Sequence, residues 1–264
     1  MNKLATIFII LICSAVCQSQ ILKIDKGNIH SDSSGYFMGA VNLNFNINNR
    51  SATAEKDIKF VGLEANADVA YIADKHAYIL INKINYFKST GGPLLSTGYA
   101  HFRTNFLRRK KLSYESFTQI QYDDGRNMPF RFLLGAGIKY RLASTEKAQL
   151  FIGIGGMFEK ENWKSIEDEH KIIKKEIWKT TNYINGKIRF NEHVSFNTVF
   201  YYQGGYDEES ELFRSRISGD VVLQMELSQR LSFTTTFTAQ YEDKPIISIN
   251  NFVYSLTNGL KWSF

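Results

Sequence analysis

Hydrophobic and polar residues alternate with a period of two along most of this chain. Between positions 37 and 48, one set of alternate residues reads Phe, Gly, Val, Leu, Phe and Ile, and the intervening set reads Met, Ala and four Asn. An α-helix would mix the two sets on every face, whereas a β-strand places them on opposite faces. Because the pattern recurs to the end of the chain, it predicts an all-β protein.

Twelve segments of this kind follow one another. We expect strands at about 36–48, 58–72, 76–87, 95–106, 111–122, 130–142, 148–158, 177–190, 193–203, 211–227, 231–241 and 251–264. Each is near or above the ~9–11 residues with which a tilted strand crosses a bilayer. Residues 77–87 alternate too poorly for their faces to be assigned, and Gly155-Gly156 predicts a bulge in the seventh strand.

The predicted connections alternate between short turns and longer loops. Short turns fall at 73–75, 107–110, 143–147, 191–192 and 228–230, and longer loops at 49–57, 88–94, 123–129, 159–176, 204–210 and 242–250. All three prolines (Pro93, Pro129 and Pro245) fall in the longer loops, as expected for a residue without an N–H for a strand ladder. Outer-membrane barrels combine short periplasmic turns with longer external loops. The order therefore predicts a closed antiparallel transmembrane β-barrel of about 12 strands.

The last predicted strand ends in an aromatic pattern. Trp262 and the final Phe264 both lie on its apolar face. This arrangement resembles the C-terminal assembly signal of outer-membrane barrels, so we expect both residues to be bound by the barrel-assembly machinery. A soluble β-sandwich whose edge strand ends in Phe is the alternative, but a sandwich rarely shows such regular alternation of loop lengths.

Residues 1–19 differ from the rest of the chain. Lys3 precedes an almost unbroken apolar run over residues 4–17, and Ser19 ends the segment with a small residue. This layout is typical of a secretory signal peptide that is cleaved after Ser19. We therefore expect export to the bacterial outer membrane, where the lipid and the lipopolysaccharide would be partners.

Two other interpretations of this leader fit its sequence less well. The apolar run is shorter than the roughly 20 residues of a spanning helix, which disfavours a retained anchor. Val16 is bulkier than the residue that usually precedes a lipidated cysteine, which disfavours a lipoprotein anchored at Cys17. With a cleaved leader at 1–19, residues 20–35 would form a periplasmic N-terminal segment and residues 36–264 the barrel.

Composition adds three constraints. Both cysteines (Cys13 and Cys17) lie in the leader, so the exported chain would need a source of stability other than a disulfide, and a closed hydrogen-bonded barrel supplies one. Aromatic residues make up 14% of the chain, as expected for a wall in which alternate residues face lipid. The formal charge is +6, but the basic residues are scattered among the predicted strands, so we expect no nucleic-acid partner.

A family resemblance lies in residues 111–142. The residues that carry it are Tyr114-Glu115-Ser116-Phe117, Gln121-Tyr122, Arg131, Leu134-Gly135-Ala136-Gly137 and Tyr140-Arg141-Leu142. They resemble domain-of-unknown-function family 481, whose members are described as salt-induced outer-membrane proteins. The resemblance implies a barrel, and it supplies no established activity and no catalytic residues.

No motif indicates an enzyme, a cofactor or a metal site. The five histidines are His30, His76, His101, His170 and His193, and none belongs to a metal-binding pattern such as HxxxH. His101 could approach Ser113 or Ser116 on the next predicted strand, but no nucleophile elbow surrounds either serine. A membrane-embedded hydrolase is therefore the least favoured function.

Two predicted external loops carry local signals. Asp123-Asp124-Gly125 resembles the start of a calcium loop but lacks the later acidic ligands of an EF-hand, so it predicts a tight turn. Glu167-Asp168-Glu169-His170 could hold a cation, although charged loops are more often simply solvated. Helical spacing that would allow a short helix at the rim is shown by Trp163, Ile166, His170 and Ile173.

The residues predicted to face the lumen indicate the function. A basic belt is expected near the external mouth at Arg131, Lys179, Arg214 and Arg216. Acidic partners are expected deeper in the lumen at Glu64, Asp68, Glu115 and Asp220. Twelve strands enclose more room than eight, but paired Arg, Lys and acidic side chains would fill most of it. We therefore predict an envelope structural or stress-related barrel with a largely filled lumen, and a small passive channel that prefers anionic solutes is the alternative.

Overall fold

The computed structural model describes residues 34–49, 59–90, 92–168, 170–228 and 231–262. The predicted signal peptide, most of the predicted periplasmic segment and the terminal Phe264 lie outside these residues, so these features stay predictions.

The described backbone consists almost entirely of strands. They are β1 (Tyr36–Asn49), β2 (Lys59–Ile72), β3 (His76–Ser89), β4 (Gly92–Phe106), β5 (Leu112–Asp123), β6 (Met128–Ser144), β7 (Ala148–Lys164), β8 (Ile172–Arg189), β9 (Val194–Asp207), β10 (Leu212–Glu226), β11 (Leu231–Glu242) and β12 (Phe252–Trp262). A 3₁₀ turn, η2 (Asp124–Arg126), joins β5 to β6, and Asp123 caps it by accepting the backbone N–H of Arg126 at 3.3 Å. Among the described residues, no helix is long and apolar enough to cross a membrane.

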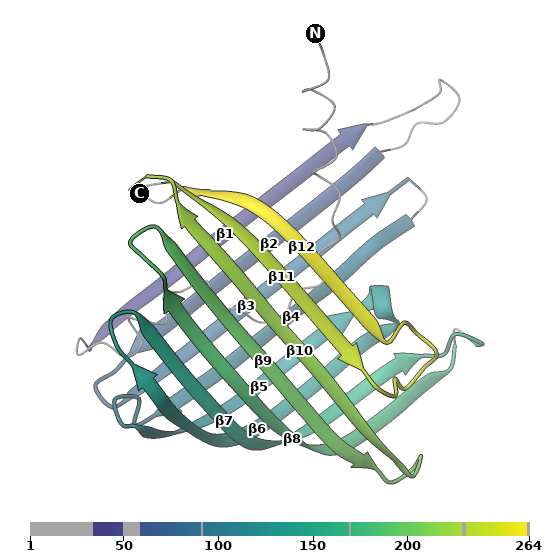
Figure 1. Cartoon of the computed structure of the whole chain (residues 1–264). Coiled ribbons are helices and arrows are strands. Elements are labelled where there is room, and N and C mark those ends of the chain that lie inside the picture. The colour runs from purple at the N-terminus through teal and green to yellow at the C-terminus, as the bar shows by residue number, and fades with distance from the viewer. Residues whose placement is uncertain (1–33, 50–58, 91, 169, 229–230, 263–264) are drawn as a thin grey trace.

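The strands form one twelve-stranded sheet in chain order. Every pairing is antiparallel and joins strands that follow one another in the sequence, which confirms the predicted all-β antiparallel meander. The sheet curls, so that β9–β12 lie in front of β1–β5 in the view of Figure 1. The pairings of the described residues do not join β1 to β12. Closure of the sheet into a barrel therefore remains a prediction.

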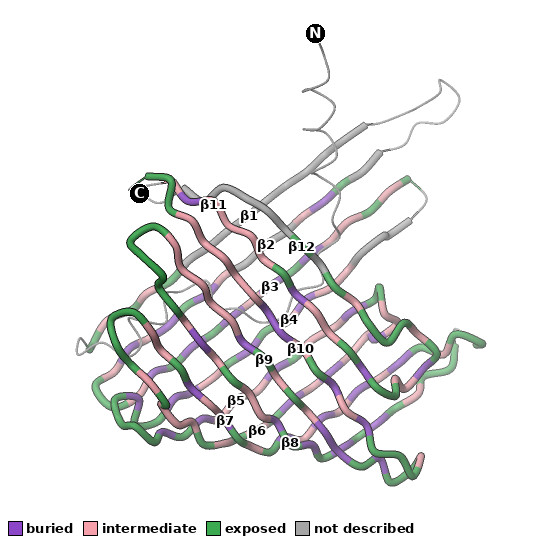
Figure 2. Tube along the Cα trace, viewed as in Figure 1, coloured by how far each residue is buried: buried purple, intermediate pink, exposed green. Residues whose placement is uncertain are grey.

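The curled sheet has charged side chains on its inner face and large apolar side chains on its outer face. Glu159, Asp220 and Arg216 are at most 4% exposed, whereas Trp178 is 74% exposed and Phe200 is 49% exposed. Figure 2 shows buried and exposed residues alternating along the central strands. This distribution reverses that of a soluble protein, in which large apolar side chains are buried and charged ones are exposed.

The hairpin of β7 and β8 extends further than its sequence suggested. β7 ends at Lys164 and β8 begins at Ile172, so both strands run into the loop that was predicted at 159–176. Trp163 faces Ile173 across the β7–β8 ladder. The short rim helix predicted from their spacing is therefore wrong. The period of two simply continues through charged residues, which resemble loop residues in composition.

The prolines also lie closer to the strands than predicted. β3 ends at Ser89 and β4 begins at Gly92, so Pro93 is the second residue of a strand, and Pro129 is likewise the second residue of β6. Each proline lies beside a register shift in the pairing with the preceding strand. A missing N–H is tolerated there because the ladder is already interrupted.

The bulge predicted at Gly155-Gly156 is wrong. The register between β6 and β7 runs evenly through both glycines and shifts only between Arg141 and Ala143. Gly155 instead lies directly opposite Gly137, and a Cβ added to Gly155 would come within 2.5 Å of the carbonyl oxygen of Ala136. These glycines therefore allow two strands to approach closely, rather than accommodating an extra residue.

The poor alternation of β3 has a structural reason. Its outward side chains include Tyr78 and Leu80, which are 36% and 40% exposed, and the inward side chains of its first half, Ala77, Ile79 and Ile81, are apolar as well. With apolar residues on both faces, the sequence shows no period of two. The inner apolar cluster consists of Ala70, Ile72, Ala77, Ile79 and Ile81.

Candidate functional site

Charged side chains gather inside the curled sheet near one of its ends. This end carries the connections 124–127, 165–171, 208–211 and 243–251, and we call it the loop end. The side chains come from η2 and from β6 to β11, where the alternation of each strand directs them inward. We call this cluster the mouth network. Its members are Arg126, Arg131, Glu159, Glu161, Lys175, Lys179, Asp207, Arg214, Arg216 and Glu242.

Glu159 of β7 lies at the centre of the mouth network and is 1% exposed. Its Oε1 accepts hydrogen bonds from Nε of Arg131 at 2.8 Å and from Nη1 of Arg216 at 2.9 Å. Lys179 of β8 forms an ion pair with Oε2 of the same carboxylate. Three cations thus compensate the burial of one carboxylate, which without them would be strongly unfavourable.

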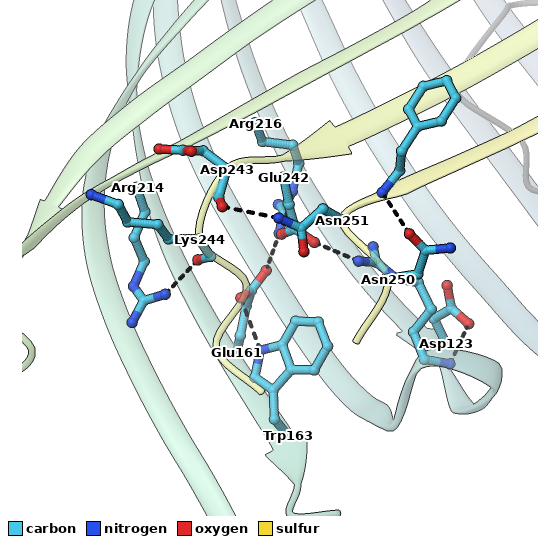
Figure 3. Close-up of polar contacts among 12 residues, drawn as sticks. Asp123, Glu161, Trp163, Arg214, Arg216, Glu242, Asp243, Lys244, Asn250 and Asn251 are labelled. Atoms are coloured by element: carbon cyan, nitrogen blue, oxygen red, sulfur yellow. Dashed lines mark hydrogen bonds and ion pairs between the residues drawn. The ribbon is translucent and has the colours of Figure 1, made fainter. Parts of the chain in front are cut away.

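Glu161 lies two residues further along β7 and therefore points to the same side of the sheet. Its Oε1 is 3.1 Å from Nε of Arg131 and 3.1 Å from Nη2 of Arg216. Its Oε2 accepts a hydrogen bond from Nε1 of Trp163 at 3.0 Å, which Figure 3 shows. Both carboxylate oxygens therefore have donors, as burial requires.

Arg216 of β10 joins the carboxylates of β7 to β11. Its Nε donates a hydrogen bond to Oε1 of Glu242, the last residue of β11, at 2.8 Å. Arg126 of η2 reaches the same carboxylate, with its Nη2 2.5 Å from Oε2. Two guanidinium groups from distant parts of the chain therefore hold Glu242, which lies close to Glu161 in Figure 3.

Asp207, the last residue of β9, organises a second part of the mouth network. Nε of Arg214 donates to its Oδ2 at 2.8 Å, and Nζ of Lys175 lies 3.2 Å from that oxygen. Lys175 also lies 2.7 Å from the exposed carboxylate of Glu209. Nη1 of Arg214 donates to the backbone carbonyl of Lys244 at 2.5 Å, which ties β10 to the β11–β12 connection (Figure 3).

The β11–β12 connection, residues 243–251, contacts the mouth network, and we call it the lid loop. Its Ile247 is 7% exposed and packs in an apolar cluster with Met128 and Trp163. The backbone N–H of Asp243 donates to the carbonyl of Ser215 at 3.0 Å. Because Trp163 contacts both Ile247 and the Glu161 carboxylate, the apolar cluster adjoins the buried charges directly.

The structure brings together the four residues that were predicted as a basic belt. These residues, all in the mouth network, are Arg131, Lys179, Arg214 and Arg216. The carboxylates that pair with them come from sequence positions predicted to lie in external loops. These carboxylates belong to Glu159, Glu161, Asp207 and Glu242. The signal that could have found the first two is their spacing, since positions 157, 159, 161 and 163 continue the inward set of β7.

The acidic residues that were predicted as partners lie deeper in the interior. Glu115 of β5 accepts a hydrogen bond from the Tyr183 hydroxyl at 2.5 Å. Asp68 on β2 and Asp220 on β10 are buried. The side chain of Glu64 lies outside the described residues. The basic belt therefore pairs with other carboxylates than the deeper acidic residues that we expected. Strands that extend past their predicted ends supply these carboxylates next to the belt.

A cavity of about 100 Å³ lies inside the sheet beside the mouth network. Arg131 and Arg216 line it on the network side, and Arg103, Glu115 and Tyr183 also line it. The cavity is large enough for water molecules or a solute of a few atoms, but it is below the usual size of a drug-sized ligand pocket. Side chains around this cavity therefore leave some interior space unfilled.

His101 and Ser113, which the sequence suggested as a possible pair, each have another hydrogen-bond partner. His101 lines the cavity, with Nδ1 2.9 Å from Oε1 of Gln119. Ser113 donates its hydroxyl to the backbone carbonyl of Lys139 at 3.3 Å. The histidine is thus oriented by an amide, and the serine is bonded to the backbone. Within the described ranges, no group of three or more His, Cys, Asp or Glu side chains could hold a metal ion.

Comparisons with known proteins relate the chain to a family and to a solved structure. Residues 61–264 match the family described as "Protein of unknown function, DUF481", as the residues between 111 and 142 suggested. No curated protein matches the chain. A structure titled "NanC porin structure in rhombohedral crystal form" is similar over 77% of this chain and 94% of that chain, with a TM-score of 0.47 and 9% sequence identity.

Proposed function

The chain belongs to the DUF481 family, and from this premise and the geometry of its interior we propose that it is an outer-membrane β-barrel whose lumen is plugged at the external mouth. The observation that carries the proposal is the ion pair of Arg216 with Glu159, which connects β10 to β7 inside the sheet. The mouth network and the lid loop together would form the plug. Such a barrel would serve the envelope as a structural element and pass little solute.

The outer face supports insertion in a bilayer. Large apolar side chains are exposed in the middle of several strands, among them Ile184 at 51% and Phe200 at 49%. A surface of this kind is unfavourable in water and is typical of the lipid-facing band of a barrel. Strands of eleven or more residues, such as β12, are long enough to cross at a tilt.

Closure of the sheet follows from membrane insertion on physical grounds. An open edge exposes a row of backbone N–H and C=O groups, and each such group left unsatisfied in hydrocarbon costs several kcal/mol. We infer that β1 pairs with β12 in the bilayer, which leaves no edge. Charged side chains buried in the lumen then need partners of opposite charge, and the mouth network provides such pairs.

A small passive channel for anions is the second candidate, and the cavity of about 100 Å³ supports it. That space continues inward from Arg131 and Arg216, so movement of the lid loop and these two side chains would lead into an unfilled part of the lumen. Basic side chains at the entrance would then favour anions over cations.

Two experiments test the proposal. Fractionated envelopes should contain the protein in the outer membrane, with a gel mobility that changes on heating because a closed ladder resists detergent until it unfolds. Recovery in the soluble fraction would contradict the location. Liposomes that contain the purified protein should swell in a small sugar no faster than protein-free liposomes, whereas rapid swelling would contradict the plug.

A further inference from the structure

Arg103 of β4 is held in an unusual way beside the interior cavity. Its guanidinium carbon lies 5.9 Å from the ring centroid of Phe117 and 5.9 Å from that of Tyr183. A planar guanidinium stacks well on aromatic faces, and two such contacts restrict its orientation. In the strand register, Arg103 lies opposite Phe117 of β5, and Phe117 lies opposite Gly135 of β6. Arg103 is therefore level with a position on β6 that is four residues away from Arg131 of the mouth network. The group is therefore separate from the mouth network.

The hydrogen-bonding capacity of this guanidinium is not used up. Its Nε is buried and makes no hydrogen bond within the described part of the chain. The neighbouring carboxylate, Glu115, binds the hydroxyl of Tyr183 at 2.5 Å and lies 3.8 Å from Nζ of Lys139. Because a buried donor normally finds an acceptor, the free Nε–H marks a place where an acceptor is expected.

The surroundings of Arg103 define the kind of acceptor. The cavity beside it is partly open and measures about 100 Å³, so only a small solute fits. Apolar and aromatic side chains form part of the remaining wall, and four side-chain amides also line it, from Gln119, Gln121, Gln203 and Gln240. An arginine that offers Nε–H together with one Nη–H presents two parallel donors, and a carboxylate accepts both in a planar fork. A spherical anion such as chloride cannot match both directions equally well.

We propose that this cavity is a binding site for a small carboxylate, held by Arg103 through Nε and Nη and bordered by amide side chains. Arg103 supplies a positive charge beside the cavity, which favours an added anion electrostatically. The site goes beyond the proposed function, because binding in the lumen requires no passage through the mouth network.

Binding can be measured with ¹³C-labelled acetate added to the full exported protein in detergent micelles. The acetate NMR line should broaden with the native protein, and Arg103→Gln should reduce the excess linewidth about ten-fold or more, as loss of a charge-assisted bidentate contact predicts. Arg109→Gln is the matched control, because Arg109 lies in a turn where it pairs with Asp74 at 2.8 Å and is partly exposed. This control should broaden the line as the native protein does. Equal broadening by the native protein and Arg103→Gln would overturn the proposal.

Competition on the native protein keeps the test independent of how Arg103→Gln folds. Formate should displace acetate, whereas pivalate, which is too bulky for a cavity of about 100 Å³, should not. Displacement by pivalate as readily as by formate would overturn the cavity as the site. Displacement by an equal concentration of chloride would overturn the carboxylate preference. None of these results depends on conductance, so failure of this site and failure of the plugged barrel are distinguishable.

Discussion

Nη1 of Arg216 on β10 lies 2.9 Å from Oε1 of Glu159 on β7, although 57 residues separate them and β8 and β9 lie between their strands in the sheet. The contact therefore crosses the inside of the curled sheet and does not follow the ladder. A link of this kind restrains two wall segments that backbone hydrogen bonds do not join directly. In the proposed barrel, it would also place opposite charges where a solute would have to pass.

Glu159→Gln should destabilise the protein by about 3–5 kcal/mol. The change leaves three buried cations around a neutral amide, and the loss of one partner of a buried ionic cluster is costly. Glu176→Gln is a matched control on the same hairpin, since the Lys160–Glu176 pair is about half exposed and should contribute at most about 1 kcal/mol. Urea unfolding followed by gel mobility would measure the stability of both variants. Equal unfolding midpoints of Glu159→Gln and Glu176→Gln would contradict a stabilising role of the mouth network.

Gly155→Ala should be more damaging than Gly156→Ala, although the two glycines are adjacent. A Cβ at Gly155 would lie 2.5 Å from the carbonyl oxygen of Ala136, so the backbone would have to shift at a cost of roughly 1–3 kcal/mol. A Cβ at Gly156 would meet nothing closer than the carbonyl oxygen of Lys179 at 4.0 Å. Thermal unfolding midpoints of the two variants would compare them. A larger loss in Gly156→Ala would contradict the register.

The architecture could be predicted from the sequence because a period of two is visible wherever one face is apolar and the other polar. It disappears in β3, where Ile79 and Ile81 face inward and Tyr78 and Leu80 face outward. It is also hard to recognise at the end of β7, where charged side chains such as Glu159 face inward. Composition there resembles a loop, and only the spacing shows that the strand continues.

The candidate site was predictable only in part, for a related reason. The alternation of inward and outward residues along each strand indicates which cations face inward. Arg131, Arg214 and Arg216 could therefore be grouped from sequence alone. Their partners could not, because a pairing such as that of Arg216 with Glu242 depends on strand lengths at the loop end. The free Nε of Arg103 depends on side-chain packing around it, which no sequence pattern reports.

Ile184→Lys should destabilise the protein in a bilayer by about 2–4 kcal/mol, because a charge on the lipid face of a barrel is unfavourable near the membrane centre. Ile166→Lys is the control, since Ile166 is similarly exposed (52% against 51%) but lies in the connection between β7 and β8. Unfolding in lipid vesicles would measure both. If the two substitutions had equal and small effects, the outer face would not be in contact with lipid.

Ile247→Ala should loosen the lid loop without unfolding the strands. The side chain packs against Met128 and Trp163, and its loss removes the buried apolar anchor of residues 243–251. Proteinase K should then cleave this loop several-fold faster than in the native protein, whereas Ser248→Ala, at an exposed position, should not change the rate. Unchanged cleavage of Ile247→Ala would mean that the loop is held in another way.

Planar-bilayer recording of the purified exported protein tests the plugged lumen most directly. The native protein should show little conductance, and Arg214→Ala/Arg216→Ala should conduct more, because the double substitution removes the contacts to Asp207, Glu159, Glu161 and Glu242. Heat-modifiable migration of the double variant would verify that it is folded. Large, stable, anion-selective conductance of the native protein that falls in the double variant would contradict the plug and favour an open anion channel.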